Sequence, residues 1–207
     1  MSVVNRDGLA PNVDGRTARA MRTRAAIVDA CIALVEEGAL RPTASRIAER
    51  GRVSVRSIFQ HFDDIEGLYA AVGDRLIARV ARLVTPVDAT LPLTQRIEAV
   101  VTQRAKVLEA VTPIRRAAAV HAPFSAEVRA RLQSGHDDLR SELDTVFKTE
   151  LDRRRGAARI RMLDAIDVLL SWPTWDSLRA LNGRSPAEAR AVLDEVLRAL
   201  LVGEPAS

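Results

Sequence analysis

The chain has 207 residues and a net charge of +4, with 47% hydrophobic, 28% charged and 3% aromatic residues. This composition is ordinary for a soluble folded protein of one medium domain, or of two small ones that share a core. No apolar run is long enough to span a bilayer, the first residues lack an apolar secretory segment, and the single Cys31 cannot support a disulfide framework. We therefore expect a reduced, cytoplasmic protein without membrane contact.

The net positive charge is confined to the N-terminal third of the chain. Residues 1–62 hold ten arginines and six acidic residues, whereas the remaining residues hold 21 basic and 21 acidic groups. A basic end joined to a neutral body favours contact between that end and a polyanion. Charge alone leaves open that these arginines only solvate helix faces.

Residues 1–15 contain Gly and Pro among polar residues and show no period, which predicts a mobile tail. From Thr17 to Val35, apolar residues recur every three or four positions, as on one face of a helix. Gly38 stands where a C-cap glycine belongs, so we expect the first helix to end just before it.

Two short helices joined by a tight turn follow. Thr43 can cap the first, which ends at Gly51, and Ser54 can cap the second, over residues 55–62. Together with the first helix, they predict a helix-turn-helix arrangement, in which a small helix is held so that its outer side chains enter a major groove. The expected packing residues are Ile47, Ala48, Val53, Ile58 and Phe62, and the expected outward residues are Val55, Arg56, Ser57, Gln60 and His61.

The rest of the chain keeps a helical period and shows no strand alternation. Further helices are expected over residues 64–83, 92–111, 125–152, 157–181 and 186–202. Pro113 and Pro123 are expected to break the pattern between the second and third of these, and Pro173 to kink or divide the fourth. We therefore predict an all-α protein of about nine helices, with a small basic front end and a larger neutral back end.

The segment from Thr43 to Phe62, Thr-Ala-Ser-Arg-Ile-Ala-Glu-Arg-Gly-Arg-Val-Ser-Val-Arg-Ser-Ile-Phe-Gln-His-Phe, resembles the TetR family of bacterial transcriptional regulators. The features that match in order and spacing are Ile47-Ala48, Val53-Ser54, His61-Phe62 and Asp64-x-Glu66-x-Leu68. The resemblance implies a DNA-binding domain over residues 16–64, with its helix-turn-helix motif over 43–62. It further implies a helical regulatory domain over 65–207, with a ligand pocket and a dimer interface mainly within 157–202.

Three positions depart from the family pattern. Phe59 stands where the family usually has Tyr, and Ile65 where it frequently has Lys, so two phosphate contacts are missing. Arg52 stands at the glycine of the family's turn, and it therefore either takes a positive φ at a cost of about 1 kcal/mol or changes the turn. Arg52 and Arg56 are expected to replace some of the lost phosphate contacts.

The resemblance and the outward positions together give a set of expected DNA contacts. Arg56 is the leading candidate for reading a base, because its guanidinium can pair in bidentate fashion with guanine, and the alternatives are a phosphate contact or a free surface arginine. Thr43 either touches phosphate or only caps its helix. The expected DNA-binding residues are Thr43, Arg52, Ser54, Val55, Arg56, Ser57, Phe59, Gln60 and His61.

Two further sets follow for the back half. The candidate ligand-binding residues are Arg104, Leu108, Arg115, His121, Phe124, Phe147, Ile166, Leu169, Trp172 and Trp175. They combine apolar surface with a few polar anchors, although aromatic residues at helical spacing are more often plain core. The candidate dimer contacts are Leu163, Leu170, Ala189, Val192, Leu193, Val196 and Leu200.

No catalytic or metal-binding pattern is present in the sequence: the three histidines and Cys31 lack ligand spacing, and no phosphate-binding glycine loop occurs. We expect no enzyme activity, no metal and no cofactor. The leading hypothesis is a homodimeric repressor that binds a palindromic site in double-stranded DNA and is released by an unknown small-molecule effector. The rival hypothesis is a helical ligand- or partner-binding protein whose DNA-binding module has decayed.

Overall fold

A computed structural model describes residues 15–202, and over that range it is entirely helical. The prediction of an all-α protein is confirmed. Ten α-helices are present among these residues, one more than expected, because the predicted helix over 125–152 is divided at Phe147. In chain order the elements are α1 (Gly15–Glu36), α2 (Ala44–Gly51), α3 (Val55–His61), α4 (Ile65–Val80), α5 (Leu93–His121), α6 (Ala126–Val146), α7 (Lys148–Leu151), α8 (Ala157–Leu169), α9 (Trp172–Asp176), the π-helical turn η1 (Ser177–Leu181) and α10 (Pro186–Val202).

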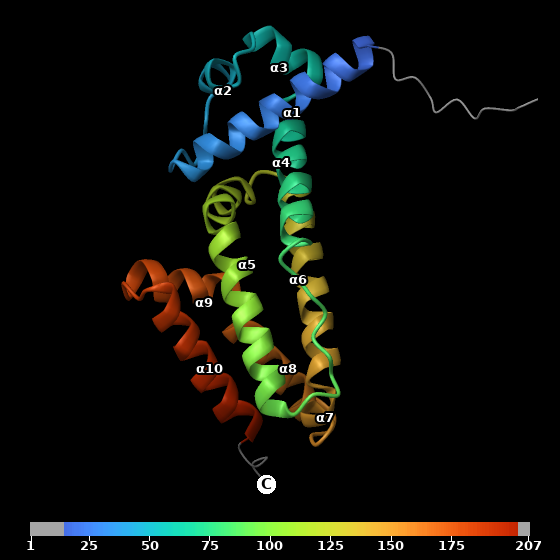
Figure 1. Ribbon diagram of the computed structural model, residues 1–207, viewed down its shortest axis with the longest axis vertical. Helices are drawn as coiled ribbons and strands as arrows, with labels where there is room; N and C mark the ends of the chain where they lie inside the picture. Colours follow the sequence, from blue (N-terminus) through green and yellow to red (C-terminus); the bar gives the residue numbers. More distant parts are fainter. Residues whose placement is uncertain (1–14, 203–207) are drawn as a thin grey trace, which may run out of the picture.

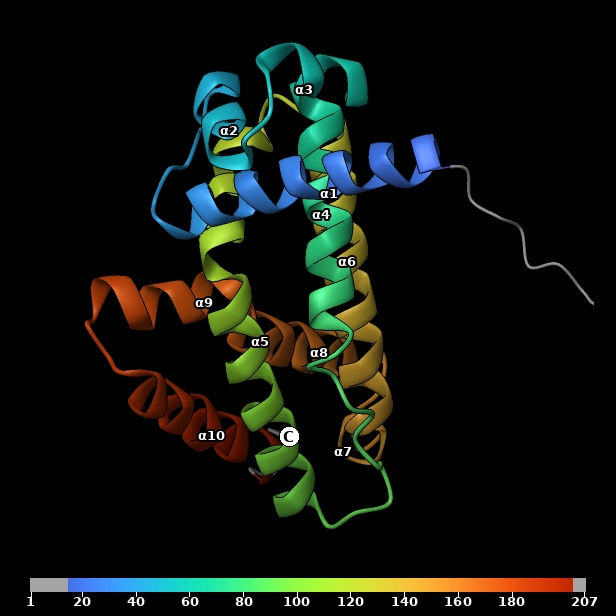
Figure 2. The ribbon, with the colours of Figure 1, turned by 45° about the horizontal axis from the view of Figure 1, so that its top comes forward.

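The helices form two parts, which we call the N-terminal module and the body. The module consists of α1, α2 and α3 at one end of the molecule, and the body consists of α5 to α10 (Figure 1). α4 leads from the module into the body, where it lies beside α6 (Figures 1 and 2). Residues 1–14 of the predicted tail lie outside the described residues, and α1 begins at Gly15.

Each part has its own hydrophobic core. The core of the module combines apolar residues of α1, α2, α3 and the first half of α4 with Ile114 and Ala117 from the far end of α5. The core of the body is built from α5, α6, α8, α9 and α10 around Phe147 and Trp175, both fully buried. α4 and α5 therefore connect the parts mechanically, because each contributes to the module's core and then continues into the body.

The expected break at Pro113 is wrong. α5 runs from Leu93 to His121 with Pro113 inside it, and only Pro123 lies in a connection between helices. A proline removes one N–H donor from the helix ladder. Val111 and Ile114 on either side of Pro113 are buried, so tertiary packing holds the helix together across the missing hydrogen bond.

Pro173 behaves as expected, since the predicted helix over 157–181 is divided. α8 ends at Leu169, and α9 starts at Trp172 with Pro173 in its first turn, a position where a proline loses no helical hydrogen bond. Within residues 15–202 no helix is both long enough and apolar enough to cross a membrane.

An ion pair that the sequence did not suggest lies at the base of the body. Arg96 of α5 and Glu150 of α7 are both almost fully buried, and their side chains form two parallel hydrogen bonds of 2.8 Å. The same guanidinium donates to the carbonyl oxygens of Val146, at 2.7 Å, and Leu91, at 2.8 Å. The bond to Arg96 lowers the pKa of Glu150, and the bond to Glu150 raises the pKa of Arg96. A buried pair of this geometry satisfies both charges.

Candidate nucleic-acid interface

The helix-turn-helix segment is held by close packing against α1. Ile47 and Ala48 of α2 and Ile58 of α3 are buried in the core of the module, as expected. Gly51, at the end of α2, lies directly on α1: a Cβ there would be 3.4 Å from Ala30 Cβ. The angle of α2 and α3 relative to α1 is therefore fixed by tight contacts rather than by the connecting turn alone.

The turn between α2 and α3 contains the one non-glycine residue with positive φ among the described residues. Arg52 adopts φ 52° and ψ 42°, and its N–H donates to the carbonyl of Glu49 at 3.2 Å. Of the two alternatives that the sequence left open, the positive φ is the one observed. This conformation costs an L-residue about 1–2 kcal/mol, and it leaves the Arg52 side chain exposed beside α3.

Both predicted N-caps are present. The hydroxyl of Thr43 accepts a hydrogen bond from the N–H of Arg46 at 3.4 Å, and the hydroxyl of Ser54 accepts one from the N–H of Ser57 at 3.0 Å. The hydroxyls of Ser54 and Ser57 also lie 3.1 Å apart. These contacts fix the starts of α2 and α3, and they leave Thr43 and Ser54 exposed to solvent.

α3 presents an outer face that combines apolar and polar side chains. Val55 is 40% exposed and Phe59 52% exposed, and they share one side of the helix at a spacing of four. Arg56 and Gln60 occupy the adjacent exposed side, whereas Ser57 and His61 are half-buried. The expected DNA-binding residues thus lie together on and around α3, with two of them turned partly inward.

The arginines of the module differ in how their charges are satisfied. Arg50 forms an ion pair with Glu37, and the guanidinium carbon of Arg24 lies 4.7 Å from the centre of the Phe62 ring. Arg52 and Arg56 form no ion pair with any residue in the range 15–202. Their charges are therefore available to an external anion.

The module contacts the body through the end of α5. The rings of Tyr69, on α4, and His121, on α5, lie 4.3 Å apart, and Arg41 donates to the carbonyl of Val120 at 3.3 Å. Burial lowers the pKa of His121, which favours its neutral form. This junction connects the loop before α2 to α4 and α5.

The candidate ligand-binding residues do not gather around one cavity. Leu108, Phe147, Ile166 and Trp175 are buried side by side in the core of the body, with Leu169 and Trp172 packed against them. His121 and Phe124 lie at the other end of α5, near the module, and Phe124 is 76% exposed.

The two arginines among these candidates are both on α5. The guanidinium carbon of Arg115 lies 5.5 Å from the centre of the Trp172 ring, a cation–π contact. Arg104 is nearly fully buried and lines a small cavity between α5 and α6.

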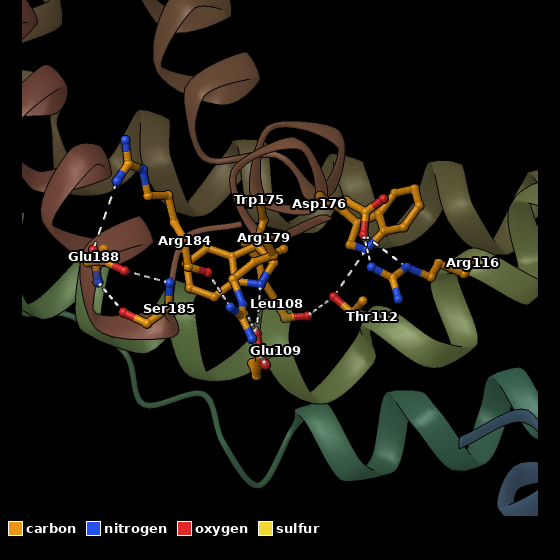
Figure 3. Close-up of polar contacts among 11 residues, drawn as sticks. Leu108, Glu109, Thr112, Arg116, Trp175, Asp176, Arg179, Arg184, Ser185 and Glu188 are labelled. Atoms are coloured by element: carbon orange, nitrogen blue, oxygen red, sulfur yellow. Dashed lines mark hydrogen bonds and ion pairs between the residues drawn. The ribbon is translucent and has the colours of Figure 1, made fainter. Parts of the chain in front are cut away.

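Polar contacts fasten α9 and η1 to α5 on the side of the core away from this cavity. The carboxylate of Glu109 accepts hydrogen bonds from Trp175 Nε1 and from Arg179, each at about 3.0 Å (Figure 3). Arg116 pairs with Asp176 at 2.7 Å, next to the Thr112 hydroxyl (Figure 3). These bonds use the polar atoms of α9 and η1 for internal structure.

The candidate dimer residues are divided between the core and the surface. Leu163, Leu170, Ala189 and Leu193 are buried within the protomer, where they fill the core of the body. Val192 and Leu200 are half-buried, and Val196 is exposed. Ile160 and Val168 on α8 are exposed as well. They were not among the predicted dimer residues, because the helical period does not show which apolar face turns inward.

Among the described residues, no three His, Cys, Asp or Glu side chains gather closely enough to hold a metal ion. No protein-family model matches the sequence, and no curated protein matches it significantly. Solved structures do match the fold. A transcriptional regulator from Rhodococcus sp. Rha1 aligns with 89% of this chain and 96% of its own, at a TM-score of 0.63 and 19% identity.

Two further solved structures are of proteins described as TetR-family regulators. A putative TetR-family transcriptional regulator from Mesorhizobium loti aligns over 89% of this chain and 97% of its own, with a TM-score of 0.57 and 18% identity. A TetR-family member from Streptomyces coelicolor aligns over 89% and 91%, with a TM-score of 0.50 and 19% identity. The protein therefore has the fold of the TetR family of transcriptional regulators.

Proposed function

We propose that the protein is a homodimeric transcriptional regulator that binds a palindromic sequence in double-stranded DNA. The observation that carries this proposal is the outer face of α3. Arg56 and Gln60 project there from a short helix whose orientation is fixed by Gly51 and the core of the module. A small, rigidly supported helix with exposed polar and cationic side chains is suited to the major groove.

Each exposed residue has a role that suits its chemistry. The fork of Arg56 can pair with O6 and N7 of guanine, and Gln60 can pair with adenine. Val55 and Phe59 offer apolar contact to thymine methyl groups or sugars, which gives Phe59 a use despite its missing hydroxyl. Arg52, exposed in the turn before α3, is proposed to contact a phosphate.

The dimer is proposed to form through the outer faces of α8 and α10. The apolar side chains at least partly exposed on these helices are Ile160, Val168, Val192, Val196 and Leu200. A two-fold axis through this surface would present two copies of α3 to successive major grooves, about 34 Å apart. Val196→Arg should give monomers in light scattering, because it places a charge in the interface without disturbing the protomer core. A persistent dimer would locate the interface elsewhere.

We further propose that the regulator is a repressor released by a small molecule. A ligand between the helices of the body would move α4, which starts at the module and ends in the body, and so change the spacing of the two α3 helices. A preference of about 1–3 kcal/mol for the spacing that does not fit DNA is enough for useful coupling.

The test is enrichment of genomic DNA fragments by the purified protein, followed by sequencing. The wild type should enrich fragments that share a palindrome. Arg56→Ala should lose the enrichment or relax one base position per half-site. Arg155→Ala, which removes the same charge from an exposed site in the body, should enrich the same palindrome as the wild type. Folded wild-type protein that enriches no motif would contradict the proposal and favour a decayed DNA-binding module.

A further inference from the structure

The junction between the module and the body contains a buried nitrogen without a protein partner. His121 is the last residue of α5, and its ring is half-buried. Its Nε2 atom is shielded from solvent and forms no hydrogen bond, and within residues 15–202 no other buried side-chain nitrogen or oxygen is left in this state. Buried polar atoms are normally hydrogen-bonded, so this exception needs a physical reason.

His121 lies where three segments of the two parts meet. The centre of its ring is 4.3 Å from that of Tyr69, on α4, and the two rings are tilted by 43°. A hydrogen bond joins His121 to the backbone of Leu40, in the loop before α2. In the same loop, Arg41 donates to the carbonyl of Val120 at 3.3 Å. The ring of His121 therefore links the end of α5 to the helix-turn-helix segment and to the helix that leads into the body.

The groups around the ring of His121 act on its pKa in opposite directions. Burial has the largest effect and lowers the pKa, and the charge of Arg41 lowers it further. The hydrogen bond to Leu40 and the charge of Glu66, on α4, raise it. The carboxylate of Glu66 also lies 3.4 Å from the hydroxyl of Ser125. The net effect is a lowered pKa, so the ring is neutral at neutral pH.

The other titratable groups at the junction offer the ring no negative charge. Burial raises the pKa of Tyr69, and it raises the pKa of Cys31, which acts on Tyr69 from α1, to about 12, so both groups are neutral. Arg129, on α6, donates to the carbonyl of Ala122 at 2.7 Å and adds positive charge beside the end of α5.

A proton on His121 changes what its ring requires. The bond to Leu40 raises the pKa, so the ring donates it, and because Nε2 has no partner, the donor is Nδ1. In the neutral ring, Nε2 is then an unpaired acceptor. In the protonated ring, it carries an N–H donor and shares a positive charge, and burying these without a partner costs more than burying a neutral acceptor.

We propose that His121 is a pH-sensitive contact between the module and the body, and that uptake of a proton by its ring separates the loop before α2 and the first half of α4 from the end of α5. The module then loses a contact that fixes its orientation relative to the body. The separation is a property of the fold alone, whereas its effect on DNA binding rests on the proposed function.

The direction of the effect follows from the lowered pKa. Above pH 6.5 the ring is neutral in the closed and the open junction, so pH has no influence. As the pH falls below 6.5, the open junction takes up a proton more readily than the closed one, and the equilibrium shifts towards the open form.

The proposal is tested by amide hydrogen exchange of the purified full chain, without DNA, at about pH 7.5 and about pH 5.5. After correction for the intrinsic effect of pH on exchange, residues 38–43 and 114–121 of the wild type should exchange roughly threefold to tenfold faster at the lower pH. Residues 97–108, in the core of the body, should not change. His121→Phe keeps a ring against Tyr69 and cannot take up a proton, so its junction should exchange equally at both pH values.

His136→Phe is the matched control, because it removes a histidine from α6 within the body, and it should behave like the wild type. His121→Gln also lacks a titratable ring and is a second variant if circular dichroism shows that His121→Phe is not folded. In an NMR titration of the wild type, the imidazole signal of His121 should have its midpoint below pH 6.5. Equal wild-type exchange at both pH values, the same acceleration in the His121 variants, or a midpoint at or above pH 6.5 would overturn the proposal.

The effect on DNA binding is measured separately, with the palindrome that the wild type enriches. The affinity of the wild type should fall more between the two pH values than that of His121→Phe. Since both proteins keep His61 on α3, the difference between them is due to His121. Because the exchange experiment contains no DNA, its failure is distinguishable from a failure of the enrichment experiment, which tests DNA binding alone.

Discussion

The N-terminal module and the body differ in whether their arginines form ion pairs. In the body, arginines commonly pair with carboxylates across helices, as in Arg116–Asp176, Arg140–Asp164 and Arg159–Asp144. On the outer side of the module, Arg52 and Arg56 form no ion pair with any described residue. An arginine in an ion pair between two helices holds those helices together, whereas the charge of an unpaired arginine remains available to an external anion. On this basis the outer side of the module is suited to a polyanion.

Arg104 differs from the paired arginines of the body because it forms no ion pair with any described residue. Arg96 is the residue to compare it with. The two residues lie on the same helix, eight positions apart, and each is 5% exposed. Arg96 has a bidentate carboxylate, which raises its pKa, whereas burial lowers the pKa of Arg104. Because the two residues are equally exposed but only Arg96 has an ion-pair partner, substitutions at the two positions should have opposite effects on stability.

The largest effect is expected from Arg96→Met. This substitution leaves Glu150 buried without its partner, so the free energy of unfolding should fall by about 3–5 kcal/mol in urea denaturation. The matched control is the double variant Arg96→Met/Glu150→Leu, which removes both charges and should recover most of the loss. A fall of less than about 1 kcal/mol in the single variant would show that the pair contributes no more than a surface ion pair.

Arg104→Met should change stability in the other direction. Methionine has a similar length and no charge, so the protein no longer desolvates a charge that has no ion-pair partner, and the free energy of unfolding should rise by about 1–2 kcal/mol. The same urea denaturation measures it. A loss as large as that of Arg96→Met would mean that Arg104 has an essential structural partner, and the contrast between the two positions would disappear.

A smaller gain is expected at the strained arginine of the module. Arg52→Gly removes the cost of a positive φ and should raise the free energy of unfolding by about 0.5–1 kcal/mol. Arg52→Ala is the control, because it removes the charge and keeps the backbone strain, and it should give no such gain. Equal stability of the two variants would indicate that the turn is not strained.

The last prediction concerns stability at acid pH and implies no difference at neutral pH. Arg96 holds the pKa of Glu150 below its usual value of 4.5, so the ion pair contributes fully above pH 4.5, and its contribution is lost as the pH falls through the lowered pKa. Unfolding free energies measured from neutral to acid pH should therefore fall more steeply below pH 4.5 in the wild type than in Arg96→Met/Glu150→Leu. Parallel curves would contradict this role of Glu150.

The sequence predicted the module in more detail than the body. Residues close together in the sequence determine caps and turns, so the caps Thr43 and Ser54 could be inferred from neighbouring positions, and the positive φ of Arg52 was one of two alternatives. The contact between Arg96 and Glu150 spans 54 positions, and nothing local marks the two residues as partners.

In the body, packing between helices decides features that local rules leave open. Pro113 is tolerated because buried neighbours hold α5 together. Leu163 and Leu193 lie on the two helices that the resemblance assigns to the dimer interface, and in the structure they fill the protomer core. An amphipathic pattern shows that a helix has an apolar face, but not which partner covers it.

The claim that Arg52 and Arg56 bind DNA phosphates and bases is tested most directly by the salt dependence of binding. A labelled genomic duplex is titrated with the wild type, Arg52→Ala and Arg56→Ala at several salt concentrations. We predict that the logarithm of the wild-type affinity falls linearly with the logarithm of the salt concentration, with a slope of about 0.9 for each phosphate that the protein neutralises. Arg52→Ala should reduce this slope by about 0.9, the amount expected for one lost phosphate contact. A wild-type affinity that does not change with salt, or equal slopes for all three proteins, would contradict the account.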